Sequence, residues 1–326
     1  MTVNRILQDQ ALVEEIAKSL EQSSGTPVGA PSLRADELRR MAEQAQHGFE
    51  SNPTEVQEAI IRRQGRPVFF IQDGRIEASG GGVWSDRIDA ARAVLDPGLP
   101  AVGRLELAGS ADRRVAAGTG WLVAPDVVVT NRHVAIQFAS QTDTGFSFNV
   151  NPNLEQVEVG IDFLREHARA SKRAFDIVGV IHIEPGGASP DVALLKVCSR
   201  GGQDEAQPSC IRLIDGSTPV GATVGVVGYA EPDPVLNPQD VTASIFGDVY
   251  GVKRFHPGET LEPTRRDLTH DCSTLGGNSG SVVLDFATGK AVGLHYSGYF
   301  EKRNYAVPAA KLLEILHKLK IEVPSG

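Results

Sequence analysis

One short stretch, "HDCSTLGGNSGSVV" (residues 270–283), gathers small and polar residues around a single serine, Ser279. Two glycines lie just before this serine and one follows it directly. Glycine costs about 0.5–1 kcal/mol relative to alanine inside regular structure, so such a cluster indicates a special backbone geometry. A hydroxyl becomes an effective nucleophile when a base accepts its proton and donors stabilise the oxyanion. We therefore interpret Ser279 as a candidate nucleophile.

Other interpretations of glycine-rich segments have to be weighed. A glycine-rich hairpin turn would use the same residues, and the stretch alone does not separate it from a nucleophile loop. A phosphate loop is disfavoured, because no Gly-Lys-Ser/Thr follows. A second segment, "GATVGVVGYAEP" (221–232), does not have the G-x-G-x-x-G spacing of dinucleotide-binding proteins and is better explained by strand and turn positions.

A base and a carboxylate that orients it are the other two requirements of this chemistry. His133 lies near the end of the segment "GWLVAPDVVVTNRHV" (120–134), directly after an apolar strand pair. Asp191 begins the apolar run "DVALLKV", whereas Asp176 in "FDIVGV" has a similar context. We favour Asp191 and keep Asp176 as the alternative. A histidine after a hairpin or an acid at a strand edge is also common without any catalytic role.

Taken together, the segments "VVVTNRHV", "DVALLKV" and "GGNSGSVV" resemble the chymotrypsin-like (trypsin-like) serine peptidases, in which His, Asp and Ser follow in this order. The resemblance covers residues 100–320, roughly. It implies a mainly β fold of two six-stranded antiparallel barrels, and a serine endopeptidase that works through an acyl-enzyme. It also implies the roles of the residues: the catalytic residues are His133, Asp191 and Ser279, and the oxyanion hole is formed by Gly277, Asn278 and Ser279.

Within this family the chain looks closest to the bacterial glutamyl endopeptidase-like branch, through "STLGGNSGS" and "AVGLHYSG". The branch typically lacks the disulfides of the animal enzymes. The resemblance implies that Thr274 and His295 bind a substrate's P1 carboxylate, and hence cleavage after Glu or Asp. It also implies that Tyr296, Ser297 and Gly298 pair with the substrate as a strand. Nearly a hundred residues precede the barrels here, so we expect self-cleavage after Glu77 in "RIEASGGG".

The elements that must position these residues follow from the sequence pattern. From residue 100 onward, short β-branched runs alternate with Gly, Pro and Asp turns, which predicts many short antiparallel strands. The spacing of apolar residues predicts helices over 3–21, 33–47 (capped by Ser32), 52–65, 85–95 and 308–320. We expect three parts: a helical module (1–66) acting as pro-segment, adaptor or dimerisation piece, a linker (67–99) and a peptidase domain (100–326).

The amino-acid composition limits the classes of molecule that this protein is expected to bind. The net charge of −9 disfavours nucleic acid and anionic membranes as partners, and no long apolar span occurs. The three cysteines show no paired framework or CxxC, so we expect reduced thiols and a cytoplasmic location, although a Cys198–Cys210 bridge stays open. No cofactor and no metal are expected; the partner is a protein or peptide substrate, with a regulatory partner at residues 1–66. The alternative function is a catalytically silent scaffold that recruits partners through its helical N-terminus.

Overall fold

The computed structural model describes residues 6–22, 33–47, 66–79, 81–108, 114–151, 154–170, 172–198, 206–232, 245–299 and 303–324. The chain divides into two compact units. One comprises Met1–Pro67 with Ala78–Ala90, and the other comprises Val68–Glu77 with Ala91–Gly326. The predicted boundaries of module, linker and peptidase domain remain a prediction.

The first unit contains a pair of amphipathic helices, α2 (Gln10–Gln22) and α3 (Ala35–Gln46). Each buries one apolar face, and Arg39 of α3 forms ion pairs with Glu14 and Glu21 of α2. The N-cap of α3 is Arg34, without a side-chain cap, so the prediction of Ser32 as the cap is wrong. The helix predicted over 52–65 lies outside the described residues. A further helix, α5 (Val83–Leu95), confirms the one predicted over 85–95.

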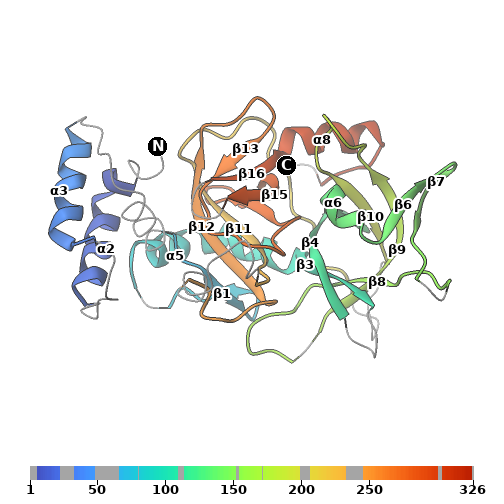
Figure 1. Cartoon of the computed structure of the whole chain (residues 1–326), viewed down its shortest axis with the longest axis horizontal. Coiled ribbons are helices and arrows are strands. Elements are labelled where there is room, and N and C mark those ends of the chain that lie inside the picture. The colour runs from blue at the N-terminus through green and yellow to red at the C-terminus, as the bar shows by residue number, and fades with distance from the viewer. Residues whose placement is uncertain are drawn as a thin grey trace. The chain divides into compact units, whose positions relative to one another are not determined.

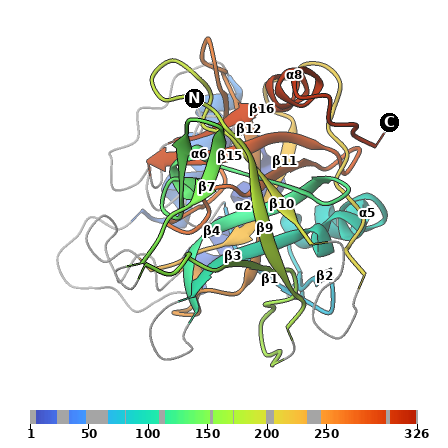
Figure 2. The same cartoon turned by 90° about the vertical axis from the view of Figure 1, so that its right-hand side faces the viewer.

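Six strands of the second unit close into a first barrel, seen face-on in Figure 2. Around the barrel they follow the order β10-β5-β4-β3-β8-β9, and all neighbours are antiparallel. The strands are β3 (Val102–Ala108), β4 (Arg114–Ala124), β5 (Val127–Thr130), β8 (Val159–Asp162), β9 (Ala174–Ile183) and β10 (Ala193–Val197). A separate hairpin joins β6 (Ala139–Thr142) and β7 (Gly145–Phe148).

The second barrel lies next to the first and is the orange group in Figure 1. Its order is β11-β14-β15-β16-β13-β12, closed by pairing of β11 with β12. The strands are β11 (Thr223–Tyr229), β12 (Lys253–Leu261), β13 (Leu268–His270), β14 (Val282–Asp285), β15 (Ala291–Tyr299) and β16 (Arg303–Pro308). The hairpin of β1 (Phe69–Gln72) and β2 (Arg75–Ile76) extends β12. The predicted mainly β fold with two six-stranded antiparallel barrels is confirmed.

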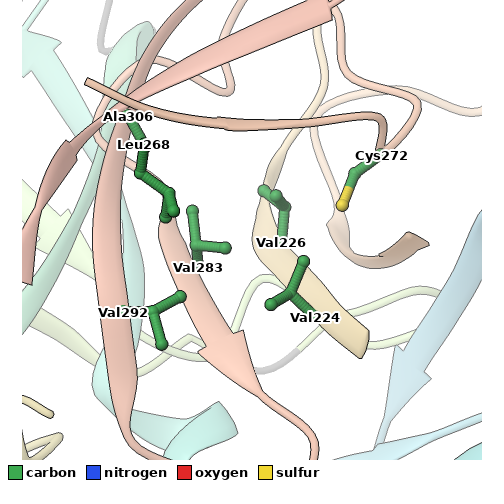
Figure 3. Packing of buried hydrophobic residues seen from close by; sticks show 7 residues of the cluster. All are labelled: Val224, Val226, Leu268, Cys272, Val283, Val292 and Ala306. Atoms are coloured by element: carbon green, nitrogen blue, oxygen red, sulfur yellow. The ribbon is translucent and has the colours of Figure 1, made fainter. Parts of the chain in front are cut away.

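Apolar side chains fill the second barrel, as Figure 3 shows for a cluster from five strands and the chain after β13. Its members are Val224, Val226, Leu268, Cys272, Val283, Val292 and Ala306. The short 3-10 helix η1 (Asp96–Ala101) leads into β3, and α8 (Ala309–Lys318) ends the fold close to its predicted range. All three cysteines are free thiols. Among the described residues no helix combines the length and apolar character needed to cross a membrane.

Buried polar contacts join the barrels. Lys253 of β12 is fully buried, and its ammonium donates to the carbonyls of Phe163 (2.6 Å) and Leu99 (3.0 Å). The hydroxyl of Tyr229 in β11 donates to Val102 O (3.4 Å) and Asp162 O (3.3 Å) of the first barrel. Because buried polar groups are stable only when paired, these contacts fix how the two barrels meet.

Candidate active site

His133 lies on a single helical turn, α6 (Arg132–Ala135), that directly follows β5. All four residues of β5 are buried, so the strand is anchored in the first barrel up to Thr130. Asn131 then takes the extended N-cap position and starts the turn. The side chain of His133 is 39% exposed, which leaves part of its ring accessible to a ligand.

Asp191, at the start of the chain that leads into β10, contacts His133 twice. Its Oδ2 lies 2.5 Å from His133 Nδ1, and its Oδ1 accepts the His133 backbone N–H at 3.0 Å. Asn131 Nδ2 donates to the Asp191 carbonyl at 2.9 Å, which ties the two segments together. The alternative acid, Asp176, lies exposed on β9 and its backbone contacts Cys198 instead. The structure therefore pairs Asp191, and not Asp176, with the imidazole.

The carboxyl group of Asp191 is held in its charged form. Burial on its own would raise the pKa, but the hydrogen bonds from His133 and the nearby Arg132 hold the pKa of Asp191 below its usual value. Arg132 Nε lies 3.8 Å from Asp191 Oδ1. A charged carboxylate beside Nδ1 favours the tautomer with the proton on Nδ1, and it stabilises the imidazolium when the ring takes a second proton.

Ser279 lies in a tight turn between the second barrel's strands β13 and β14. Gly277 and Gly280 both have positive φ, +81° and +89°, in the region that a side chain rarely adopts. A methyl group at Gly280 would also lie 2.0 Å from Thr119 O, and one at Gly277 would lie 2.4 Å from Tyr229 O. The glycines that marked this stretch in the sequence are thus required by both backbone conformation and space.

Strand β4 of the first barrel brings the serine turn to the histidine turn. The amide of Thr119 donates to Ser279 O at 2.8 Å, and the Thr119 hydroxyl donates to Gly277 O at 2.9 Å. A methyl group at Gly118 would lie 3.0 Å from Ser279 O and 2.9 Å from Val134, the residue after His133. The turn with Ser279 and the turn with His133 therefore both lie against Gly118 of β4, where the two barrels meet.

The amides around Ser279 differ in their partners. Asn278 N donates to Leu275 O at 3.3 Å within the turn. The amides of Gly277 and Ser279, in contrast, donate to no acceptor among the described residues. Two unengaged N–H groups next to a serine hydroxyl are the groups that an oxyanion needs.

Thr274 and His295 are both buried beside this turn, with 6% and 3% exposed. Thr274 Oγ1 lies 2.7 Å from Asn304 Oδ1, and Asn304 Nδ2 donates to Cys272 O at 2.6 Å. His295 O accepts the Gly280 amide at 2.9 Å, so this residue is fixed directly to the serine turn.

His295 belongs to a buried histidine cluster that sequence reasoning missed, formed with His256 and His270. Its Nδ1 lies 3.3 Å from His270 Nε2, and His256 Nδ1 lies 2.6 Å from Ser273 O. Burial lowers the pKa of His256 and of His270 to about 3, and lowers that of His295 well below its usual value, so all three are neutral near pH 7. His256 and His270 lie on β12 and β13, in runs with charged residues, and these runs gave no periodic signal in the sequence.

Residues 296–298 form one edge of β15. They pair with β16 on one side, as Ser297 with Tyr305 and Gly298 with Asn304. On the other side, the pairing of β15 with β14 covers Ala291 to Leu294 only. Within the described part of the chain, no strand covers that side of Tyr296, Ser297 and Gly298, and the last two are exposed.

A family model and a curated relative identify the family of this chain. The family model of the trypsin-like peptidase domain matches residues 118–294, more than half of the chain. A "Probable serine protease" (FE772_23060) of Lysobacter enzymogenes is 30% identical over 284 residues, which cover 78% of this chain and 72% of that protein. Among solved structures, the inactive form of a Ser-to-Ala mutant of Rv3671c from M. tuberculosis H37Rv is similar to this protein. The match covers 72% of this chain and 93% of the Rv3671c chain. The identity is 18% and the TM-score is 0.42. The chain therefore belongs to the family of trypsin-like serine peptidases, hydrolases whose substrates are proteins or peptides.

Proposed function

We propose that this protein is a serine endopeptidase in which Ser279 is the nucleophile, His133 the general base and Asp191 the residue that orients and charges the base. The observation that carries the proposal is the double contact of Asp191 with His133, at 2.5 Å to Nδ1 and 3.0 Å to the backbone N–H. This contact leaves Nε2 of His133 to accept a proton. The family membership and the unengaged amides beside Ser279 support the same assignment.

These groups are sufficient for every bond change and proton transfer of the reaction. Ser279 Oγ forms a bond to the scissile carbonyl carbon as its proton passes to His133 Nε2, and the negative oxygen is stabilised by the amides of Gly277 and Ser279. The C–N bond then breaks, and His133 gives the proton to the leaving amine. Water hydrolyses the acyl-enzyme by the same steps in reverse, with His133 again as base. Asn278, whose amide is engaged with Leu275 O, holds the shape of the turn.

The test uses an active-site-directed fluorophosphonate, which phosphonylates an activated serine hydroxyl. We expect labelling of the wild-type chain at Ser279, no labelling of Ser279→Ala, and loss of nearly all turnover in that variant, because the triad acts as a unit. Ser281→Ala is the matched control: its hydroxyl is buried and lies 3.4 Å from Asn278 Oδ1. Wild-type protein that resists the probe at full folding would support the silent scaffold instead.

We further propose that the specificity is that of the glutamyl endopeptidase-like branch, with an acidic P1 residue bound by His295 and by Thr274, whose hydroxyl turns to the substrate from its present acceptor, Asn304 Oδ1. A carboxylate buried at P1 needs charge-assisted donors. When His270 Nε2–H donates to His295 Nδ1 across their 3.3 Å separation, His295 keeps its own proton on Nε2 and can donate it to the substrate. The uncovered edge of Tyr296, Ser297 and Gly298 supports binding of an extended substrate as an added strand.

A panel of peptides that differ only at P1 (Glu, Asp, Gln, Leu, Lys) tests this specificity. We expect kcat/KM for Glu to exceed that for Gln at least about tenfold, since a charge-assisted hydrogen bond is stronger than a neutral one. Thr274→Val is expected to reduce that ratio, whereas Thr142→Val, an exposed threonine of β6, leaves it unchanged. A preference for Lys or Leu at P1 would refute the acidic pocket without touching the serine mechanism.

A further inference from the structure

A charged cleft adjoins the serine turn on the flank away from β15. Its volume is about 580 Å³, and its lining residues are Arg104, Arg114, Val115, Ala116 and Glu231. It is distinct from the Thr274 and His295 region, which contacts the turn through Gly280. Nothing in the triad or in the acidic P1 pocket uses these residues.

Glu231 connects the cleft to the oxyanion amides. Its backbone amide donates to Gly276 O at 2.7 Å, and a methyl group at Gly277 would lie 2.8 Å from its Cγ. His295 in turn holds Gly280 on the other side of Ser279. The cleft and β15 therefore flank the serine from opposite ends of the turn. If β15 binds the residues before the scissile bond, the cleft is placed for those after it.

The wall of the cleft is the outer half of β4. Residues Arg114 to Ala116 pair with β3 on one side, whereas the pairing of β4 with β5 begins only at Trp121. Val115 is 56% exposed. An extended peptide leaving Ser279 can thus run beside this edge, and every second side chain along it points to the same face.

The charges in the cleft favour an anion. Arg104 is 7% exposed, and its Nε is buried with no hydrogen-bond partner among the described residues. Its Nη2 lies 3.3 Å from Glu231 Oε1, and its Nη1 lies 3.7 Å from Glu106 Oε1 and donates to Gly251 O at 3.4 Å. Arg165 also contacts Glu106, at 3.2 Å, and Arg114 is exposed at the rim. Among the residues that line the cleft, two arginines (Arg104 and Arg114) stand against one glutamate (Glu231), an excess of one positive charge.

We propose that this cleft is a second specificity site, which binds an acidic side chain on the leaving-group side of the scissile bond, within the first three residues after it. Arg114 makes the accessible contact, and the buried Arg104 supplies the fixed positive field. The inference rests on the proposed serine endopeptidase function, because it takes Ser279 as the point of cleavage. It makes the enzyme selective for acidic segments on both sides of the bond.

The experiment uses internally quenched peptides with Glu at P1 and with Glu, Gln or Lys at each of the three following positions. We expect kcat/KM to be roughly tenfold higher for Glu than for Lys at one of these positions, and the ratio to shrink as salt rises. Arg114→Glu, a change at an exposed residue, is expected to reverse the ratio. Lys318→Ala, which removes a positive charge on the exposed face of α8, is expected to leave it as in wild type.

A glutamyl ester with no residues after the scissile bond distinguishes failure of the proposed peptidase function from failure of the cleft as a specificity site. Hydrolysis of the ester by the wild-type chain tests the proposed function alone. If the ester is hydrolysed and the Glu-to-Lys ratio is near one at all three positions, or Arg114→Glu leaves the ratio unchanged, the cleft is not a specificity site. If this ester resists hydrolysis while leucyl or lysyl esters react, the acidic P1 pocket is refuted. If none of the three esters reacts, the proposed serine mechanism fails.

Discussion

The two barrels have the same strand count but differ in what they bury. The first has an interior of apolar side chains such as Leu122, Val128 and Leu195, and the contact of His133 with Asp191 lies at its end, where the imidazole is partly exposed. The second carries polar side chains through its interior, among them His256, His270 and His295, each 3% exposed or less.

This difference separates two electrostatic tasks. The pair at the end of the first barrel keeps a carboxylate charged, because hydrogen bonds from His133 outweigh its burial. The histidines inside the second barrel lose their charge, because desolvation dominates and few counter-charges lie near them. The first barrel thus contributes a partly exposed histidine beside a charged carboxylate, and the second contributes buried, neutral histidines.

The largest effect is expected when the contact between Asp191 and His133 is broken. Asp191→Asn keeps the shape but lets the amide bind the wrong imidazole tautomer, so we expect kcat to fall about 10⁴-fold with stability little changed. Asp176→Asn is the matched control, because Asp176 is exposed on β9 and its backbone contacts Cys198 and not His133. Equal losses in the two variants, measured on one peptide substrate, would contradict the assignment of Asp191.

The next prediction concerns acid stability of the second barrel. The folded-state pKa of His256 and His270, about 3, lies below that of an unfolded histidine near 6.5. The unfolded chain therefore binds more protons than the folded chain between these pH values. The free energy of unfolding is highest above pH 6.5, as far as these two histidines determine it, and it falls as the pH drops towards 3. Urea unfolding of the wild-type protein at a series of pH values measures this slope.

Single variants assign the slope to residues. His270→Gln removes one of the protons taken up on unfolding and is expected to lower the slope by about 1.4 kcal/mol per pH unit between pH 4 and 6. His256→Gln is expected to act alike, which covers the case that one variant does not fold. His317→Gln, on the exposed face of α8, is the control. A control that changes the slope as much as His270→Gln would disprove the role of burial.

The smallest effect is expected for the close packing of the turn around Ser279 against β4 of the first barrel. Gly280 and Gly187 both have positive φ, +89° and +81°, but only at Gly280 would a methyl group meet Thr119 O, whereas Gly187 has open space. Gly280→Ala is therefore expected to lose about 1–3 kcal/mol of unfolding free energy more than Gly187→Ala, as for overpacking. Similar losses in the two variants, by denaturant titration, would show that φ alone sets the cost.

Much of the fold followed from local pattern. The apolar runs at residues 121–124, 127–130, 193–197 and 223–229 are strands as predicted, and the helix predicted over 308–320 is α8. Strands β12, β13 and β16 were not predicted, since "KRFHPGETL", "LTH" and "RNYAVP" mix charged, polar and apolar residues. Their burial depends on partners far along the chain, so no short window of sequence reveals it.

By itself, the sequence determined which residue types carry the chemistry: a serine among glycines, a histidine after a strand pair and an aspartate before another strand. Only the tertiary structure decided that Asp191 and not Asp176 contacts His133, that His256 and His270 stand behind His295, and that Arg104 and Glu231 face each other beside the serine turn. The physical reason is that nucleophile motifs are local in backbone conformation. The charge, burial and tautomer of each group are set instead by neighbours that barrel closure brings from distant parts of the chain.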